Sequence, residues 1–281
     1  MKLSIKVEPR LETPRMLGIA IPVISLAAAL LSGAVFLFFM GVSPFQAYST
    51  IIRSSLGDAY GLSETLVKAI PLAMAAIAVI LSFTMLIWNI GAEGQIFMGA
   101  IAAAAAVRYL FVDNHLAMFA IMFAAAGIAG GIWAAIAGYF RARWSVNEII
   151  TTLMLNYVAM NLLNYFVYGP WRDPASLGFP MTAPFPDAAR LPSFWGTRIH
   201  AGLFLAILFP LIFWVILRFT RWGYEIRVMG ENPKAAGFAG MSYIKNVVFV
   251  MFLSGAIAGI AGMCELSGLQ GRLQHGFSGG Y

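Results

Sequence analysis

Seven long apolar runs are the feature that most restricts how this chain can fold. A helix needs about twenty mainly apolar residues to cross the hydrocarbon core of a membrane. The expected spans are 16–40, 65–88, 96–112, 116–139, 148–168, 201–219 and 246–266. Hydrophobic residues make up 60% of the chain and charged residues 11%, against about 45–50% and 25% in a soluble domain. The sequence therefore predicts an all-α, polytopic helical bundle of about seven spans in a membrane.

Basic residues between these runs set the expected orientation. With the N-terminus in the cytoplasm, eleven lysines and arginines lie inside and six outside, as the positive-inside rule requires. The inside set is Lys2, Lys6, Arg10, Arg15, Arg141, Arg143, Arg218, Arg221, Arg227, Lys234 and Lys245. The outside set is Arg53, Lys68, Arg108, Arg172, Arg190 and Arg198, and Arg272 stays unassigned. Topology and contact with lipid headgroups thus account for the net charge of +6, and we expect membrane lipid rather than nucleic acid as its partner.

The chain divides into a short cytoplasmic N-terminal segment, 1–15, and one membrane domain, 16–281. The first apolar run is longer than a signal-peptide core of roughly 7–15 residues, so we expect an uncleaved span. Cys264 is the only cysteine, which excludes a disulfide framework and a cysteine-based metal site. No metal site is expected.

Two segments on the outer side, 41–64 and 169–200, are too long to be simple turns. One interpretation is an irregular cap over the helices, because loops commonly run over a protein surface. The other is an outer gate, or a surface that receives a delivery protein. Glycines spaced by four, such as Gly127 with Gly131 and Gly255 with Gly259, predict close seams between helices.

Polar residues interrupt the first half in the sequence W-N-I-G-A-E-G-Q. Such groups cannot face lipid, because an unpaired polar group in hydrocarbon costs several kcal/mol. Gly91 and Gly94 allow the helix to break beside a pathway, as in transporters. The alternative is a tight cytoplasmic turn with a solvated Glu93. The candidate pathway residues here are Trp88, Asn89, Glu93 and Gln95.

A similar polar, glycine-rich stretch follows the run 246–266 and begins near Glu265. Broken helices in corresponding positions of two halves indicate a site at the interface of two repeats. The likeness of 65–95 to 246–281 is one of composition and position, so the expected internal repeat is weak. Because three apolar runs follow the first break and none follows the second, we expect that the natural protein has further C-terminal spans.

The run 148–168 carries polar residues at helical spacing. Asn147 is expected to cap it, and Glu148 suits the positive N-terminal end of a helix. Glu148, Thr152 and Asn156 share one face because they are spaced by four. Asn156 either lines a polar pathway or holds two helices together.

A basic segment, 219–245, separates the last two runs and is expected in the cytoplasm. Within it, E-N-P-K-A-A-G-F-A-G predicts a very short helix, with Asn232 as N-cap, Pro233 at the first position and Gly240 at the end. Such a helix is not stable alone and needs a partner surface. Phe238 and Met241 offer it apolar contacts. The alternative is an interfacial helix lying on headgroups.

Two motifs, G-E-N-P-K-A-A-G-F-A-G-M and W-N-I-G-A-E-G-Q, resemble the permease subunit of ABC transporters in the branched-chain amino acid and simple-sugar permease superfamily. The nearest likeness is to the nucleoside and simple-sugar importer branch. The resemblance implies that Gly230–Met241 is the coupling helix seated on a cytoplasmic ATPase, and that Trp88–Gln95 lies beside the path. The coupling residues carried over are Arg227, Gly230, Glu231, Asn232, Pro233, Ala235, Ala236 and Gly240.

The same resemblance implies the partners. These are a cytoplasmic ABC ATPase that holds ATP, a second permease subunit in a homo- or heterodimer, and an extracytoplasmic substrate-binding protein, all at a bacterial inner membrane. ATP-driven closure would move the spans as rigid bodies and switch access to the site. No cofactor is expected in this chain, because it contains no G-x-x-x-x-G-K-[ST] phosphate loop.

Two other functions compete with an ATP-driven permease. An ion-coupled secondary transporter would use Glu93 and Glu265 as intramembrane carriers, but it leaves the cytoplasmic segment unexplained. An intramembrane enzyme is disfavoured because His115, His200 and His275 are far apart in sequence and Cys264 has no base beside it. We therefore expect no catalytic residues.

Overall fold

The structure, a computed structural model, describes residues 15–278. Its helices are α1 (Arg15–Phe39), α2 (Pro44–Leu56), α3 (Ala59–Phe83), α4 (Ala92–Tyr109), α5 (His115–Trp144), α6 (Glu148–Tyr168), α7 (Gly202–Phe219), α8 (Arg221–Glu231), α9 (Pro233–Phe238) and α10 (Tyr243–Glu265). Short turns of 3₁₀-helix, Pro174–Ser176 and Asp187–Ala189, and of π-helix, Leu266–Gln270, complete them. Residues 15–278 hold no strand beyond two isolated bridges. The all-α prediction is confirmed.

The chain divides into two compact units, Met1–Leu62 and Ser63–Tyr281. In the first, the Tyr48 hydroxyl of α2 donates a hydrogen bond of 2.6 Å to the carbonyl of Leu30 in α1. The segment 41–64 was expected to be irregular, and that expectation is wrong. Ser43 caps α2 and Pro44 occupies its first position, which are strong local signals for starting a helix.

Within the described residues, six helices are long and apolar enough to cross a membrane: α1, α3, α5, α6, α7 and α10 with its π-helical extension. The seventh expected span is α4, which does not reach the same hydropathy. It has Glu93 in its first turn and Arg108 in its last. Twelve of its residues are buried, so α4 lies inside the bundle and meets protein rather than lipid.

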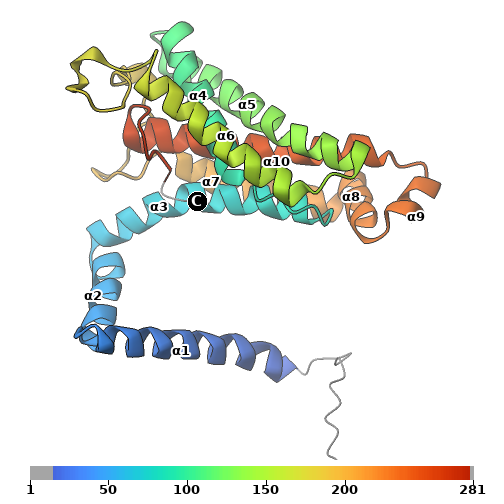
Figure 1. Ribbon diagram of the computed structural model, residues 1–281, viewed down its shortest axis with the longest axis horizontal. Coiled ribbons are helices and arrows are strands. Elements are labelled where there is room, and N and C mark those ends of the chain that lie inside the picture. The colour runs from blue at the N-terminus through green and yellow to red at the C-terminus, as the bar shows by residue number, and fades with distance from the viewer. Residues whose placement is uncertain (1–14, 279–281) are drawn as a thin grey trace, which may run out of the picture. The chain divides into compact units, whose positions relative to one another are not determined.

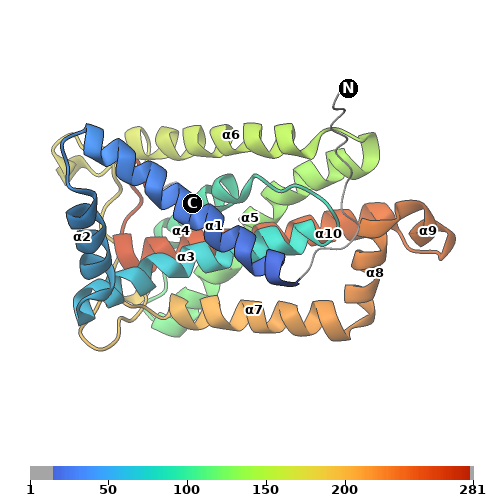
Figure 2. The same ribbon diagram turned by 90° about the horizontal axis from the view of Figure 1, so that it is seen from below.

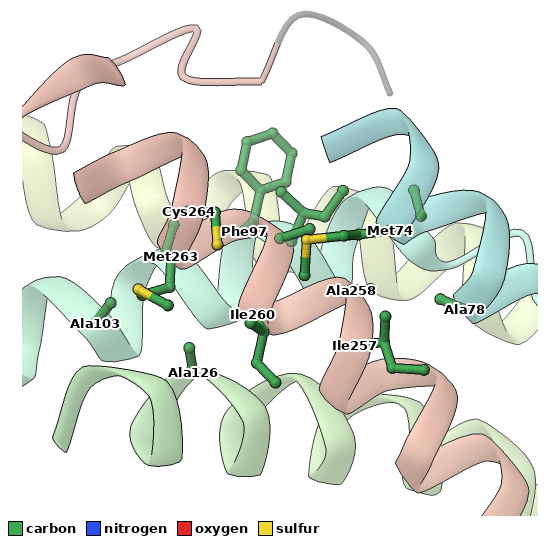
Figure 3. Packing of buried hydrophobic residues seen from close by; sticks show 14 of the residues in the cluster. Met74, Ala78, Phe97, Ala103, Ala126, Ile257, Ala258, Ile260, Met263 and Cys264 are labelled. Carbon is green, nitrogen blue, oxygen red and sulfur yellow. The ribbon is translucent and has the colours of Figure 1, made fainter. Parts of the chain in front are cut away.

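The second unit is built around α10, which packs on α5 and α4 through the predicted small-residue seams. A Cβ atom on Gly255 would lie 2.2 Å from the carbonyl oxygen of Gly130, and one on Gly259 would lie 2.3 Å from that of Ala126. Backbones this close leave no room for a side chain, so glycine is required at both positions. Apolar side chains such as Met74, Ile260 and Met263 fill the space beside the seams (Figure 3).

The bundle of the second unit has two different ends. Figure 1 shows α8 and α9 at one end and the irregular segment 169–200 at the other. Seen from below, α6 and α7 occupy opposite edges of this bundle, with α4, α5 and α10 between them (Figure 2). The predicted cytoplasmic segment 219–245 and the predicted outer segment 169–200 therefore lie at opposite ends of this bundle.

Candidate translocation and coupling sites

The first candidate site is the connector, residues 84–91, which joins α3 to α4 without regular helix. Its side chains alternate: Met85, Ile87 and Asn89 are buried, whereas those between them are exposed. Residues 84–86 form a turn and Leu86 has a φ of +55°, so the connector is not a regular extended strand. The helix break predicted from sequence is present, with Gly91 preceding the first residue of α4 and Gly94 inside that helix.

The Asn89 amide is buried and makes four hydrogen bonds. Its nitrogen donates to the Gln95 side-chain oxygen at 3.1 Å and to the Ser254 hydroxyl at 2.9 Å. Its oxygen accepts from the Gln95 side-chain nitrogen at 2.8 Å and from the Gly91 backbone at 3.0 Å. The Ser254 hydroxyl donates in turn to the carbonyl of Ala78. Asn89, Gln95 and Ser254 thus form a polar network that ties the connector to α3, α4 and α10.

Asn156 of α6 ties the same region to a further helix. Its side-chain oxygen accepts a 2.8 Å hydrogen bond from the backbone of Gly94, and its nitrogen donates at 2.9 Å to the carbonyl of Ile90. A Cβ atom on Gly94 would lie 2.6 Å from the Asn156 side-chain oxygen. The close approach of α4 and α6 at this point depends on that glycine.

These bonds place Asn89 and its partners within the bundle, whereas Leu86, Trp88 and Ile90 of the same connector are exposed. Ser254 lies eleven residues beyond Tyr243, the first residue of α10, and Asn156 lies eight beyond Glu148, the first of α6. At 1.5 Å per residue they stand about 16 and 12 Å inside the bundle. Non-helical backbone at such depth is tolerated because protein satisfies its polar groups.

The other two candidates in this stretch, Trp88 and Glu93, lie at its margin. Trp88 is 53% exposed, its ring centroid is 5.2 Å from that of Phe83, and its backbone N–H donates to Glu148 at 3.5 Å. Glu148, which is buried, also pairs with Arg141 at 3.3 Å. Asn147 caps α6 as predicted. Glu93 is half-buried in the first turn of α4.

The predicted short helix of the basic segment is α9. The Asn232 side chain accepts a hydrogen bond from the backbone of Ala235, and Pro233 occupies the first position. Gly240 follows the last turn with a φ of +80°, a value that favours glycine. The rest of the segment is less of a loop than expected, because α8 occupies Arg221–Glu231.

The coupling residues divide by exposure. Exposed are Glu231, Asn232, Pro233, Ala235 and Gly240. Gly230 and Ala236 are buried, and the guanidinium of half-buried Arg227 donates to the carbonyl of Leu217 in α7. Phe238 is 95% exposed. The face that α9 presents to solvent therefore includes Phe238, whereas Ala236 faces the protein.

Helix α8 is fixed on both sides by close backbone contacts. A Cβ atom on Gly223 would lie 2.3 Å from the carbonyl oxygen of Ile216 in α7. A Cβ atom on Gly230 would lie 2.5 Å from the carbonyl oxygen of Thr84, at the start of the connector. The element that carries α9 is thus in direct contact with the segment that leads to Asn89.

A charge pair between exposed Lys68 and buried Glu265 joins α3 to the end of α10. The Glu265 side chain is 1% exposed, and one carboxylate oxygen lies 3.8 Å from the ammonium of Lys68. The Gln270 amide donates to the same oxygen at 3.4 Å. The pairing of Glu265 with Lys68 was missed from sequence, because the two residues are far apart in the chain and meet only when α3 packs on α10.

His200 was set aside as an isolated histidine, yet it is fully buried. Its Nδ1 accepts a 3.2 Å hydrogen bond from the backbone of Gly202, and a Cβ on Gly268 would lie 2.3 Å from the ring. Burial disfavours the charged ring and lowers its pKa from 6.5 to about 4. His200 is therefore a neutral packing residue at neutral pH. Residues 15–278 contain no group of three or more histidine, cysteine, aspartate or glutamate side chains placed to hold a metal.

Two relatives are similar to this chain over most of its length. The glucose ABC transporter permease protein TsgB13 of Haloferax volcanii is 38% identical over 295 residues, covering 100% of this chain and 76% of the relative. The guanosine ABC transporter permease protein NupP of Bacillus subtilis is 32% identical over 261 residues, covering 89% of this chain and 72% of the relative. No solved structure matches the chain significantly.

A family model agrees with these relatives. The model described as the permease component of the branched-chain amino acid transport system matches residues 61–279, which include every element of the polar network and of the coupling segment. The family consists of transporters rather than catalysts. The chain belongs to this family of ABC transporter permeases and is a multi-pass membrane protein.

Proposed function

We propose that this chain is the permease subunit of an ATP-driven importer for simple sugars or nucleosides. The observation that carries the proposal is the position of α9, which is exposed to solvent and joined to the connector through α8. This short helix presents Phe238, 95% exposed, and it is carried by α8, which touches the connector through Gly230. A helix of six residues is not stable alone, and its exposed apolar residue suits a groove on a partner. The partner is a cytoplasmic ABC ATPase, which supplies the ATP site.

The contacts of α8 support a route for coupling. A movement of α9 on its ATPase shifts α8, whose last turn abuts Thr84. Because Asn89 of the connector is hydrogen-bonded to Gln95 of α4 and Ser254 of α10, a shift of the connector would also move these two helices. Packed elements of this kind move as rigid bodies between two arrangements. Access to a site beside the connector would alternate in this way.

The remaining partners follow from the same proposal. A second permease subunit completes the pathway, so that each permease meets one ATPase subunit. An extracytoplasmic binding protein delivers the substrate to the end that carries 169–200. The orientation places α8 and α9 in the cytoplasm, at a bacterial inner membrane. The names of the two relatives support sugars and nucleosides as substrates. An ion-coupled mechanism is weaker, because the Glu265 carboxylate lies 3.8 Å from the Lys68 ammonium and so already has a charged partner.

Replacing Phe238 with Asp tests the docking of α9. The variant should insert and fold normally but lose co-purification with the ATPase, because an exposed apolar contact becomes a charge. Gly237→Ala is the matched control: a Cβ there has no neighbour within 4 Å, so the complex should persist. Ala236→Glu should unfold the segment, because Ala236 is 1% exposed. Normal ATPase association and uptake in Phe238→Asp would refute the assignment of α9.

A further inference from the structure

Helix α6 has an unusual combination of exposure and polarity. Only 22% of the most apolar stretch of α6 is buried inside the protein. Yet the mean hydropathy of that stretch, 1.2, is the lowest among the six candidate spans. Helix α7, at the opposite edge of the bundle (Figure 2), is 11% buried with a hydropathy of 2.3. An exposed helix that faces lipid is expected to be strongly apolar. Helix α7 meets this expectation and α6 does not.

Both sides of α6 carry apolar residues, and the exposed side includes Ile150, Met154 and Val158, which are 59%, 49% and 51% exposed. The side turned toward α4 and α5 consists of Glu148, Thr152, Ala159, Leu163 and Val167, which are buried. The other side includes Tyr157, Asn161 and Tyr165, which are exposed. Their spacings of four place these three on one face of the helix. We call Tyr157, Asn161 and Tyr165 the α6 stripe.

The depth of Tyr157 and Asn161 excludes a simple interfacial role for these two residues. Tyr157 lies nine and Asn161 thirteen residues beyond Glu148, which is about 14 and 20 Å along a helix about 30 Å long. Tyrosines at the ends of a span commonly anchor it in the headgroup region, but Tyr157 is near the middle. An asparagine at this depth that faced hydrocarbon would carry unpaired polar atoms.

Local hydrogen bonding does not satisfy Asn161. Its amide nitrogen donates to the carbonyl of Tyr157, one turn earlier in the same helix. The amide oxygen is an acceptor and takes no part in that bond. By contrast, the neighbouring Asn164 is engaged with another element, since its oxygen lies 2.8 Å from Nδ1 of His275.

We propose that the α6 stripe lines the water-filled path and binds neutral, hydroxylated ring compounds. The inference rests on the proposed function and adds the substrate-contacting residues to it. Tyr157 and Tyr165 offer aromatic faces for the rings of sugars and bases, and Asn161 exchanges hydrogen bonds with hydroxyl or amide groups. The stripe contains no aspartate, glutamate, lysine, arginine or histidine, which favours neutral solutes over amino acids or ions. Few polar groups among aromatic side chains are typical of small-molecule sites.

Cysteine labelling of the assembled transporter tests whether water reaches this face of α6. Cys264 is the only cysteine and is buried, so Cys264→Ala provides the background. Tyr157→Cys and Asn161→Cys should react with a charged, water-soluble methanethiosulfonate. Leu211→Cys on α7 is the matched control, because Leu211 is 56% exposed and Tyr157 53%, and it should stay unreactive in lipid. Equal, slow labelling at all three positions would overturn the proposal.

Substrate protection and kinetics test the binding role. Saturating glucose or guanosine, whichever the parent complex transports, should slow labelling at Asn161→Cys. Asn161→Leu should raise KM about fivefold to tenfold, the loss of one neutral hydrogen bond. Labelling without protection, together with an unchanged KM, would overturn the binding role. If the assembled transporter takes up only amino acids, the proposed substrate class is wrong. The difference in labelling between α6 and α7 would still show whether α6 lines a water-filled path.

Discussion

The polar network around Asn89 should behave as one energetic unit. Asn89→Leu keeps the approximate size of the side chain but removes both reciprocal bonds to Gln95 and the bond to Ser254. Gln95 is left with a buried amide that has lost its partner, and Gln95→Leu removes two of the four hydrogen bonds of Asn89. In the double variant two apolar groups replace the bonded pair, which is far less costly than one orphaned amide. The loss of stability should therefore be strongly non-additive.

The size of the coupling follows from the two bonds. Hydrogen bonds between membrane helices contribute about 0.6 kcal/mol on average and at most about 1.7 kcal/mol. Two reciprocal bonds, at 3.1 and 2.8 Å, should give a coupling free energy of about 1–3 kcal/mol. The losses of stability of the two single variants should therefore add up to more than the loss measured for the double variant. Gly91 loses one backbone partner in every Asn89 variant, so this cost cancels in the cycle.

Reversible unfolding of the purified permease in mixed micelles measures the four free energies. Additive losses, with a coupling below about 0.3 kcal/mol, would refute the account of the network as a cooperative anchor. Transport adds a second criterion. If Asn89 and Gln95 serve mainly to position the connector, folded variants should lose turnover before they change KM. A KM effect with normal stability would instead favour direct contact with substrate.

Three further predictions test other parts of the account. Gly230→Ala forces α8 away from Thr84, so ATP hydrolysis should persist while uptake falls at least about tenfold; unchanged uptake would contradict the proposed route. Lys68→Met should lower the melting temperature by leaving Glu265 without its cation, and adding Glu265→Gln should restore most of it; absence of rescue would show that the pair is not coupled. For His200 the unfolded chain takes up a proton near pH 6.5 and the folded chain near 4, so stability should fall by at most about 3 kcal/mol as pH drops through that window. The free energy of unfolding, measured at pH 7 and at pH 5, should show this fall in the unmodified protein and not in His200→Asn. An equal fall in the variant would show that another group causes it.

Local signals in the sequence predicted the elements well. Asn147 and Asn232 cap α6 and α9 because a side-chain oxygen satisfies nearby backbone N–H groups. The apolar runs predicted the long helices, and the paired glycines predicted the seam between α5 and α10. In each case the residues that decide the structure are close together in the chain.

The contacts that define the candidate sites could not be predicted in this way. Asn89 meets Ser254 across 165 positions of sequence, and Lys68 meets Glu265 only through the packing of α3 on α10. The sequence predicted Ala236 as a coupling residue, but its side chain is buried. In a helix of six residues the sequence period does not show which side packs against the protein, so the buried side could not be predicted. The polarity of 148–168 was visible in the sequence, but its significance depends on which face is exposed.

The source of energy for uptake is the most direct test of the central claim. Proteoliposomes would contain the permease, its ATPase and a second permease subunit, with the binding protein added outside. Uptake of labelled glucose or guanosine should require ATP on the ATPase side, persist without a proton gradient, and survive Glu93→Gln. Uptake that follows a proton gradient without ATP, and that is lost in Glu93→Gln, would contradict an ATP-driven permease.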